Sequence, residues 1–165
     1  IRPLIPFAMR GVIWYQGEQD ANGQGNPEAY QERLSAMISD WRDWWGEEKM
    51  PVGIVQLPNF QKPQDKPCNA PWAKIRECQR RVAAEDPHAG LAVTIDLGEG
   101  NDIHPPEKSL VARRLARWAL ADVYKKIQLK GGPEIVSAKK DGTTILLTFR
   151  ETGSGLHVRS AEKLD

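Results

Sequence analysis

The chain has 165 residues, of which 40% are hydrophobic and 27% are charged. This length and composition suffice for one globular domain with its own core and exclude a disordered chain. Acidic and basic residues nearly balance, at 22 against 23, and the apolar runs are too short to cross a bilayer, so we expect neither nucleic acid nor a membrane as partner.

The first predicted element is a buried strand at residues 11–15, which is short, apolar and rich in branched and aromatic side chains. It runs directly into a polar loop that contains glycine. Over residues 27–45, apolar side chains recur at spacings of three and four, between a proline suited to a helix start and Gly46 suited to its end. This pattern predicts an amphipathic helix.

Strand and helix alternate twice more along the chain. A buried strand is predicted at 51–57, and a proline-rich surface loop separates it from a helix at 72–84. A third strand at 91–95 ends in a glycine-containing loop, and a last helix is predicted at 107–124. Such alternation predicts parallel strands joined by crossover helices in a layered α/β domain, with ligands at the carboxyl ends of the strands.

After residue 130 the pattern changes to a β-hairpin, with strands at 135–139 and 144–149 around an Asp-Gly turn. We therefore predict an α/β domain at 1–130 and the beginning of a β-rich domain at 131–165. Because the chain opens without Met and stops soon after the hairpin, we expect it to be part of a longer protein.

His104 is the histidine best placed for catalysis among the three in the chain. It follows a predicted buried strand, lies two residues beyond Asp102, and is kept out of the next helix by Pro105. A neighbouring carboxylate can fix the imidazole tautomer and stabilise the imidazolium ion, as in a serine-hydrolase triad. The alternative is a loop histidine that caps the next helix or faces solvent. His88 and His157 are expected to be solvated surface residues.

The loop after the first predicted strand is the second candidate site. Gln16 offers amide N–H groups and Gly17 lets the backbone approach a ligand closely, so together they can form part of an oxyanion hole. Glu18 and Asp20 can instead bind a metal or act as acid and base. The plain alternative is a polar loop that leads into a helix. Since nothing here has metal-ligand spacing with histidine, we expect no metal site.

The helix at 72–84 carries a third candidate site, because Trp72, Arg76 and Gln79 are predicted to share one face. Trp72 can stack on a sugar ring, and Arg76 can pair with a substrate carboxylate. The alternative is an aromatic core residue with an arginine that extends past it.

No clear nucleophile accompanies the histidine. The chain contains no G-x-S-x-G elbow, and no serine follows a predicted buried strand as an exposed nucleophile should. Cys68 and Cys78 are as compatible with free thiols as with a disulfide. A base without a nucleophile indicates either an enzyme that activates water or part of a larger enzyme. The serines are Ser35, Ser39, Ser109, Ser137, Ser154 and Ser160.

Three segments together resemble the SGNH hydrolases, in the branch of sialate 9-O-acetylesterases and acetylxylan-esterase-like enzymes. They are GVIWYQGEQDA at 11–21, WAKIRECQ at 72–79 and NDIHPPEK at 101–108. The resemblance implies a three-layer flavodoxin-like α/β fold followed by a β-rich domain. It also implies removal of acetyl groups from sugar hydroxyls through an acyl-serine intermediate without a cofactor, in an extracellular or periplasmic protein.

By this resemblance His104 is the general base, Asp102 orients it, and Gln16 with Gly17 helps to form the oxyanion site, while Glu18 braces the loop near the histidine. The family's serine lies in a G-Q-S-N-type motif, which this chain lacks. The nucleophile is therefore expected on a preceding segment or a second chain. Many SGNH enzymes have an aspartate three residues before the histidine, where this chain has Asn101.

Two other functions compete with the esterase at this point. A carbohydrate-binding module without catalysis would use Trp72 and neighbouring aromatic residues as a platform for sugars. A metal-dependent hydrolase would use Glu18, Asp20 and His104. Should Asp102 fail as the partner of His104, Asp96 is a distant carboxylate in reserve.

Overall fold

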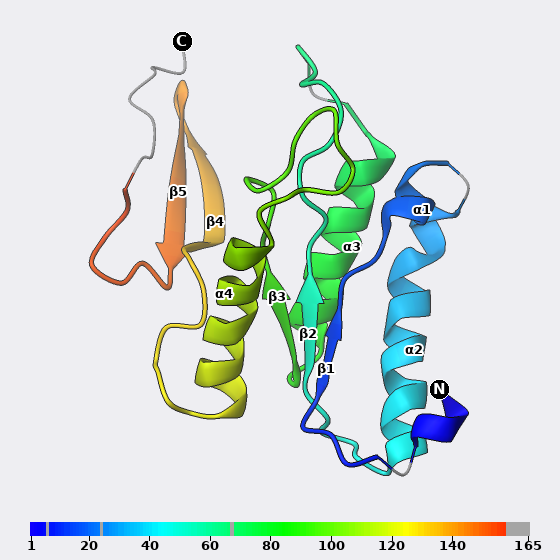
Figure 1. Ribbon diagram of the computed structural model, residues 1–165. Helices are drawn as coiled ribbons and strands as arrows, with labels where there is room; N and C mark the ends of the chain where they lie inside the picture. Colours follow the sequence, from blue (N-terminus) through cyan, green and yellow to red (C-terminus); the bar gives the residue numbers. More distant parts are fainter. Residues whose placement is uncertain (6, 24, 67, 158–165) are drawn as a thin grey trace.

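The computed structural model describes residues 1–157 except 6, 24 and 67. Its secondary structure alternates strands and helices up to residue 123 and ends in a hairpin (Figure 1). In chain order the strands and helices are η1 (Arg2–Leu4), β1 (Val12–Trp14), α1 (Glu18–Ala21), η2 (Pro27–Ala29), α2 (Tyr30–Trp45), β2 (Val52–Val55), α3 (Pro71–Glu85), β3 (Ala89–Ala92), α4 (Lys108–Trp118), η3 (Ala119–Val123), β4 (Glu134–Asp141) and β5 (Thr144–Arg150).

The centre of the fold is a three-stranded parallel sheet in the order β1-β2-β3. Helices α2 and α3 pack together on one face of the sheet, and α4 covers part of the other face (Figure 1). Each crossover therefore runs from one strand through a helix to the next parallel strand. This arrangement confirms the predicted α/β class and its three layers.

Strand β2 shows how its sequence divides the core between the two faces. Val52 and Ile54 point to α2 and α3, whereas Gly53 and Val55 point to α4, as the two-residue period of a strand requires. Trp118 of α4 lies directly over Gly53 and Gly90. A Cβ atom at Gly90 would lie 1.9 Å from the Trp118 Nε1 atom, so the indole fits only where both strands lack side chains.

Two elements differ from the sequence prediction. Strand β3 covers Ala89–Ala92 rather than 91–95, because the chain leaves the sheet after Ala92 and turns between Thr94 and Leu97, where the Leu97 N–H donates to the Thr94 carbonyl. The last helix is α-helical only to Trp118 and continues as a π-helical turn over Ala119–Val123.

Strands β4 and β5 form a separate antiparallel hairpin, as the sequence predicts. Most of its side chains are exposed, Ile135 and Ile145 among them. The assignment of residues 131–165 to a second domain stays a prediction. Among the described residues, no helix is both long and apolar enough to span a membrane.

Candidate functional site

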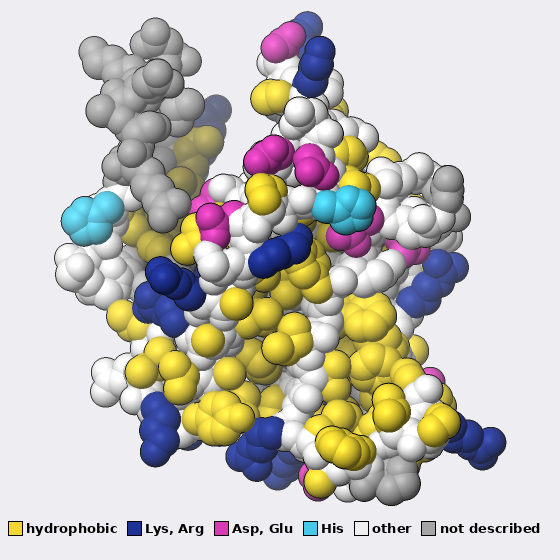
Figure 2. All heavy atoms as spheres, viewed as in Figure 1, with side chains coloured by type: hydrophobic (Ala, Val, Ile, Leu, Met, Phe, Trp, Pro, Cys, Tyr) yellow, Lys and Arg dark blue, Asp and Glu magenta, His cyan; other side chains and the backbone are white. Residues whose placement is uncertain are grey.

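The loops that follow the three strands lie together at the carboxyl ends of the strands, at the upper end of the sheet in Figure 1. They are residues 15–17 after β1, 56–60 after β2 and 93–107 after β3. Figure 2 shows charged and histidine side chains around this end, and hydrophobic side chains over the sheet between α4 and α2. The predicted site residues of all three loops therefore belong to one end of the molecule.

His104 and Asp102 are neighbours in the loop before α4. The imidazole is 90% exposed, and its Nδ1 atom lies 3.9 Å from an Asp102 carboxylate oxygen. That oxygen accepts a hydrogen bond of 2.7 Å from the backbone N–H of His104. Asp102 thus fixes the turn that presents the histidine to solvent, at ion-pair distance from the ring. The catalytic roles given to both residues stay predictions.

Asp96 is held by an arginine. Its carboxylate accepts two hydrogen bonds from the guanidinium of Arg114 on α4, at 2.5 and 2.8 Å. These bonds raise the pKa of Arg114, while burial acts in the opposite direction. Asp96 therefore anchors the β3 loop to α4. Asp102, not Asp96, is the carboxylate in contact with His104.

The Gln16–Gly17 segment is fixed by two side chains from the helices behind it. The carbonyl oxygen of Gln16 accepts hydrogen bonds from the Tyr30 hydroxyl at 2.7 Å and from the Gln79 amide at 3.0 Å. The side chain of Gln16 itself donates to Asp20 at 3.3 Å. The loop predicted to line an oxyanion site is thus anchored to both α2 and α3.

Gly17 occupies a position where only glycine fits. Its φ is 148°, and a Cβ atom there would lie 2.8 Å from the Ile75 side chain and 3.3 Å from those of Leu57 and Gln79. A side chain would have to adopt a backbone conformation that L residues avoid and would also collide with α3. The glycine therefore lets the β1 loop lie flat against the core.

The β2 loop ties the β3 loop to α3. The Pro58 carbonyl accepts a 2.7 Å hydrogen bond from the Trp72 indole, and the Asn59 side chain accepts one of 2.7 Å from the Gly98 N–H. Gly98 has no room for a side chain, since a Cβ atom would lie 2.0 Å from the Asn59 carbonyl oxygen. The position of the His104 loop is therefore set in part by Asn59.

Trp72 is a core residue. It is 6% exposed, its ring packs at 5.0 Å against Phe60, and its N–H is satisfied by the backbone. A sugar platform needs an open ring face, and Trp72 has none. For Trp72, the structure therefore favours the core alternative over stacking on a sugar.

Arg76 is half-buried beside the same loop. Its guanidinium donates to the Pro58 carbonyl at 3.4 Å, and no carboxylate partner for it is found among the described residues. Burial lowers the pKa of Arg76, because a desolvated cation without a counter-ion is disfavoured. The predicted pairing with a substrate carboxylate stays open.

Glu18 lies at the start of α1, and its negative charge acts on Tyr15. Burial raises the pKa of the Tyr15 hydroxyl, and the charge of Glu18 adds to the rise. The ammonium group of Lys108 lies 5.3 Å from the centre of the Tyr15 ring, at cation–π distance. No hydrogen bond or ion pair between Glu18 and His104 is present in the described part of the chain, so the predicted bracing role stays untested.

Within the described ranges, no three His, Cys, Asp or Glu side chains are close enough to hold a metal ion. Asp20, named for the metal alternative, is paired with Arg33 at 3.5 Å and with Gln16. Cys68 and Cys78 are free thiols, the first exposed and the second half-buried.

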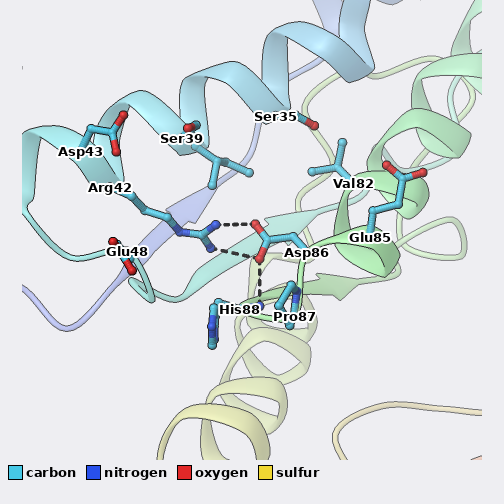
Figure 3. A pocket seen from close by; sticks show the side chains of 11 residues that line it. Ser35, Ser39, Arg42, Asp43, Glu48, Val82, Glu85, Asp86, Pro87 and His88 are labelled. Atoms are coloured by element: carbon cyan, nitrogen blue, oxygen red, sulfur yellow. Dashed lines mark hydrogen bonds and ion pairs between the residues drawn. The ribbon is translucent and has the colours of Figure 1, made fainter.

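A cavity of about 480 Å³ lies at the opposite end of the sheet, between the end of α2 and the segment after α3 (Figure 3). Arg42 and Asp86 both line this cavity. In Figure 3 the Arg42 guanidinium faces the Asp86 carboxylate and donates hydrogen bonds of 2.6 and 3.2 Å to it. His88 lines the same cavity. It is half-buried, whereas the sequence predicts a solvated surface residue. No predicted catalytic residue lines this cavity, so we assign it no part in catalysis.

None of the described serines follows a strand of the sheet. Ser35 and Ser39 line the remote cavity, and Ser109 on α4 binds the Glu107 carboxylate. Ser137 and Ser154 belong to the hairpin and the tail, and Ser160 lies outside the described residues. No nucleophile therefore faces His104 from the described part of the chain.

Sequence reasoning missed two polar residues that shape the site. Tyr30 belongs to the apolar residues of the helix predicted at 27–45, and Gln79 shares the predicted face of Trp72 and Arg76 without a role of its own. Both nevertheless bind the Gln16 carbonyl. The available signal was the pattern of α3, whose buried residues are Trp72, Ile75, Gln79 and Val82. One amide among three apolar residues on a buried stripe must have hydrogen-bond partners.

Comparison with known proteins connects this geometry to an activity. Residues 4–121 match the family described as carbohydrate esterase, sialic acid-specific acetylesterase. Human sialate O-acetylesterase is 30% identical over 138 residues, which cover 75% of this chain and 26% of that protein. The rat sialate O-acetylesterase is 29% identical over 167 residues, covering 86% of this chain and 30% of that protein.

A solved structure extends the similarity to the fold. The crystal structure of a carbohydrate acetylesterase from Xanthomonas citri is 40% identical, with a TM-score of 0.81, and covers 92% of this chain and 34% of its own. The chain thus spans about a quarter to a third of the length of these relatives. The resemblance drawn from the sequence motifs is confirmed, and the chain belongs to the sialic acid-specific acetylesterase family of carbohydrate esterases.

Proposed function

We propose that this chain supplies the general base and part of the oxyanion site of a carbohydrate O-acetylesterase, with the nucleophilic serine outside these 165 residues. The observation that carries the proposal is the placement of His104 and the Gln16–Gly17 loop at the same end of the sheet, after β3 and β1. A serine hydrolase needs both functions within reach of the same scissile carbonyl.

In the proposed reaction, His104 takes the proton of the serine hydroxyl as its oxygen attacks the acetyl carbonyl. The Asp102 carboxylate, 3.9 Å from the ring, stabilises the imidazolium ion. N–H groups of the Gln16–Gly17 loop bind the oxyanion. The C–O bond to the sugar then breaks, and the imidazolium protonates the sugar oxygen. Water, activated by the same histidine, hydrolyses the acyl-serine to acetate. No cofactor takes part.

The proposed substrate is an acetylated sugar, in line with the names of the relatives. Where the sugar carries a carboxylate, Arg76 is the cation we expect to meet it. Its guanidinium is half-buried, and in the described part of the chain it makes one long hydrogen bond. In line with the family resemblance, we propose an extracellular or periplasmic location.

The proposed partner is the polypeptide that carries the serine, either as a preceding segment or as a second chain. The free edge of β1 supports this, because Ile13 on that strand is 65% exposed on the face of the sheet that α4 covers only in part. Figure 2 shows the hydrophobic side chains gathered there. Apolar sheet surface of this kind is normally covered.

Hydrolysis of p-nitrophenyl acetate tests the proposal, with this chain alone and with a polypeptide extended to the length of the relatives. We expect rapid turnover only in the extended form, and a loss in kcat on the order of 10⁴-fold on His104→Ala. His88→Ala, in the remote cavity, is the matched control and should keep full activity. Near-normal activity of the His104 variant, or no activity in the extended form, would overturn the proposal.

A further inference from the structure

Gln79 connects four parts of the fold through one side chain that is fully buried. Its Oε1 atom accepts a 2.9 Å hydrogen bond from the Leu57 N–H, and its Nε2 atom donates to the Gln16 carbonyl at 3.0 Å and to the Tyr30 hydroxyl at 3.4 Å. It therefore joins α3 to α2, to the β1 loop and to the β2 loop. Both ends of the amide are used, which fixes its orientation.

The direction of the Gln16 carbonyl determines the direction of the next N–H. The described chain has no cis peptide bond, and in a trans peptide the C=O and the following N–H point in opposite directions. Because Gln79 and Tyr30 hold the Gln16 oxygen against the helices, the Gly17 N–H points away from them. No acceptor for this N–H is found among the described residues, which leaves it available to a ligand.

We infer that Gln79 is a positioning residue for the esterase reaction: with Tyr30, it locks the Gln16–Gly17 peptide so that the Gly17 N–H stands ready as an oxyanion donor. This rests on the proposed function. The donor works only if its direction is set before the charge develops, since a peptide free to rotate would reorient during the reaction. Gln79 itself touches no substrate.

The residues around the peptide support this assignment over that of a simple core amide. Gly17 has no room for a side chain against Ile75, Leu57 and Gln79, so the loop cannot shift toward α3. Tyr30 donates to the same oxygen at 2.7 Å from the opposite helix. Two independent donors on one carbonyl oxygen make its orientation unambiguous.

The test uses Gln79→Met and Tyr30→Phe in the extended polypeptide, each of which removes hydrogen bonds while keeping side-chain bulk. We expect kcat to fall on the order of 10²-fold for Gln79→Met, as for a displaced donor, with KM within about threefold of the wild type. Tyr30→Phe should cause a smaller loss. The double variant should lose less than the product of the two single losses, because both act on one oxygen.

Asp86→Asn is the matched control, because it breaks the pair with Arg42 at the opposite end of the sheet. It should lower stability without changing kcat. If Gln79→Met and Asp86→Asn lower kcat equally, or if Gln79→Met raises only KM, the positioning role is refuted.

Amide hydrogen exchange of this chain separates the inference from the proposed function. In Gln79→Met, the Leu57 amide hydrogen should exchange at least about tenfold faster, because it loses its hydrogen-bond acceptor. The NMR chemical shift of the Gly17 amide should also change. An extended wild-type polypeptide without activity would refute the esterase proposal. Unchanged Leu57 and Gly17 amides in Gln79→Met would refute the lock itself, whatever the activity.

Discussion

Glu77 shows how a single surface carboxylate on α3 is stabilised by its own helix. It accepts hydrogen bonds of 2.8 Å from Arg80, three residues on, and from Arg81, four residues on. The bond from Arg80 is the main cause that holds the pKa of Glu77 at about 2, below its ordinary value of 4.5. The ionised form is therefore favoured in the folded chain.

This lowered pKa predicts a pH-dependent loss of stability. A carboxyl group whose pKa is lower in the folded chain adds to the free energy of unfolding at pH values above its unfolded-state pKa. Glu77 therefore loses this contribution as pH falls from about 4.5 to about 2. Since the side chain is 43% exposed, we expect only about 0.2–1 kcal/mol. Urea unfolding at about pH 6 and about pH 3 should show that Glu77→Gln is less stable than the wild type by a larger margin at the higher pH. An equal difference at both values would contradict the assignment.

The residues of the site differ in how far the sequence could reveal them. His104 and Gly17 could be predicted because each follows a strand, where local sequence carries the signal. The role of Gln79 could not, because its partners Leu57 and Gln16 lie 22 and 63 residues away. The buried position of Trp72 likewise depends on the Pro58 carbonyl and on Phe60, which only the folded loop brings near.

At the scale of elements, one tryptophan determines how α4 lies on the sheet. Trp118 is 6% exposed and covers Gly53 and Gly90, two residues paired side by side in β2 and β3. Glycine is generally unfavourable in strands. It is present at both positions because the indole ring above them leaves no room for a side chain. The helix and the sheet are thus complementary in shape at a single contact.

Gly90→Ala should therefore destabilise the chain. The added methyl would lie 1.9 Å from Trp118 Nε1, and overpacking of this kind costs about 1–3 kcal/mol. Gly131→Ala is the control, since no atom lies within 4 Å of a Cβ atom there, and its effect should stay within about 0.5 kcal/mol. Thermal unfolding measures the stability of both variants. Equal melting temperatures for Gly90→Ala and Gly131→Ala would contradict the role of Trp118.

The contact of Trp118 with Gly90 also explains why the third strand begins earlier in the structure than the sequence predicts. Branched residues favour strands, and Val93 and Ile95 suggested a strand at 91–95, yet they are 46% and 48% exposed. The true strand begins at Ala89 and includes Gly90, which only the position of Trp118 requires. The other strands and helices that the sequence predicts agree with the structure to within a few residues, because their periodicity is local.

For the whole molecule, the parallel sheet and its layers could be predicted from the alternation of strands and helices. The open edge of β1 could not, because side-chain patterns do not tell whether a strand has one neighbour or two. Ile13 reads as a buried residue in sequence but is 65% exposed in the structure.

This exposure predicts self-association of the isolated chain. Ile13→Thr keeps the branched shape but removes apolar surface, and we expect it to weaken association up to about tenfold. Ile135→Thr, on the hairpin and 62% exposed, is the matched control and should change association less. Sedimentation equilibrium provides the measurement. Equal effects of the two variants would show nonspecific association rather than contact through β1.

The two sheets also differ in how much chain must be brought together to form them. The hairpin joins residues as near as Asp141 and Thr144, whereas β1 pairs with β2 about forty residues further along the chain. Closing a short loop is fast, and pairing distant parallel strands is slow. The hairpin therefore forms early during folding, and the loops that carry His104 and Gly17 take their places only once the strands before them have paired.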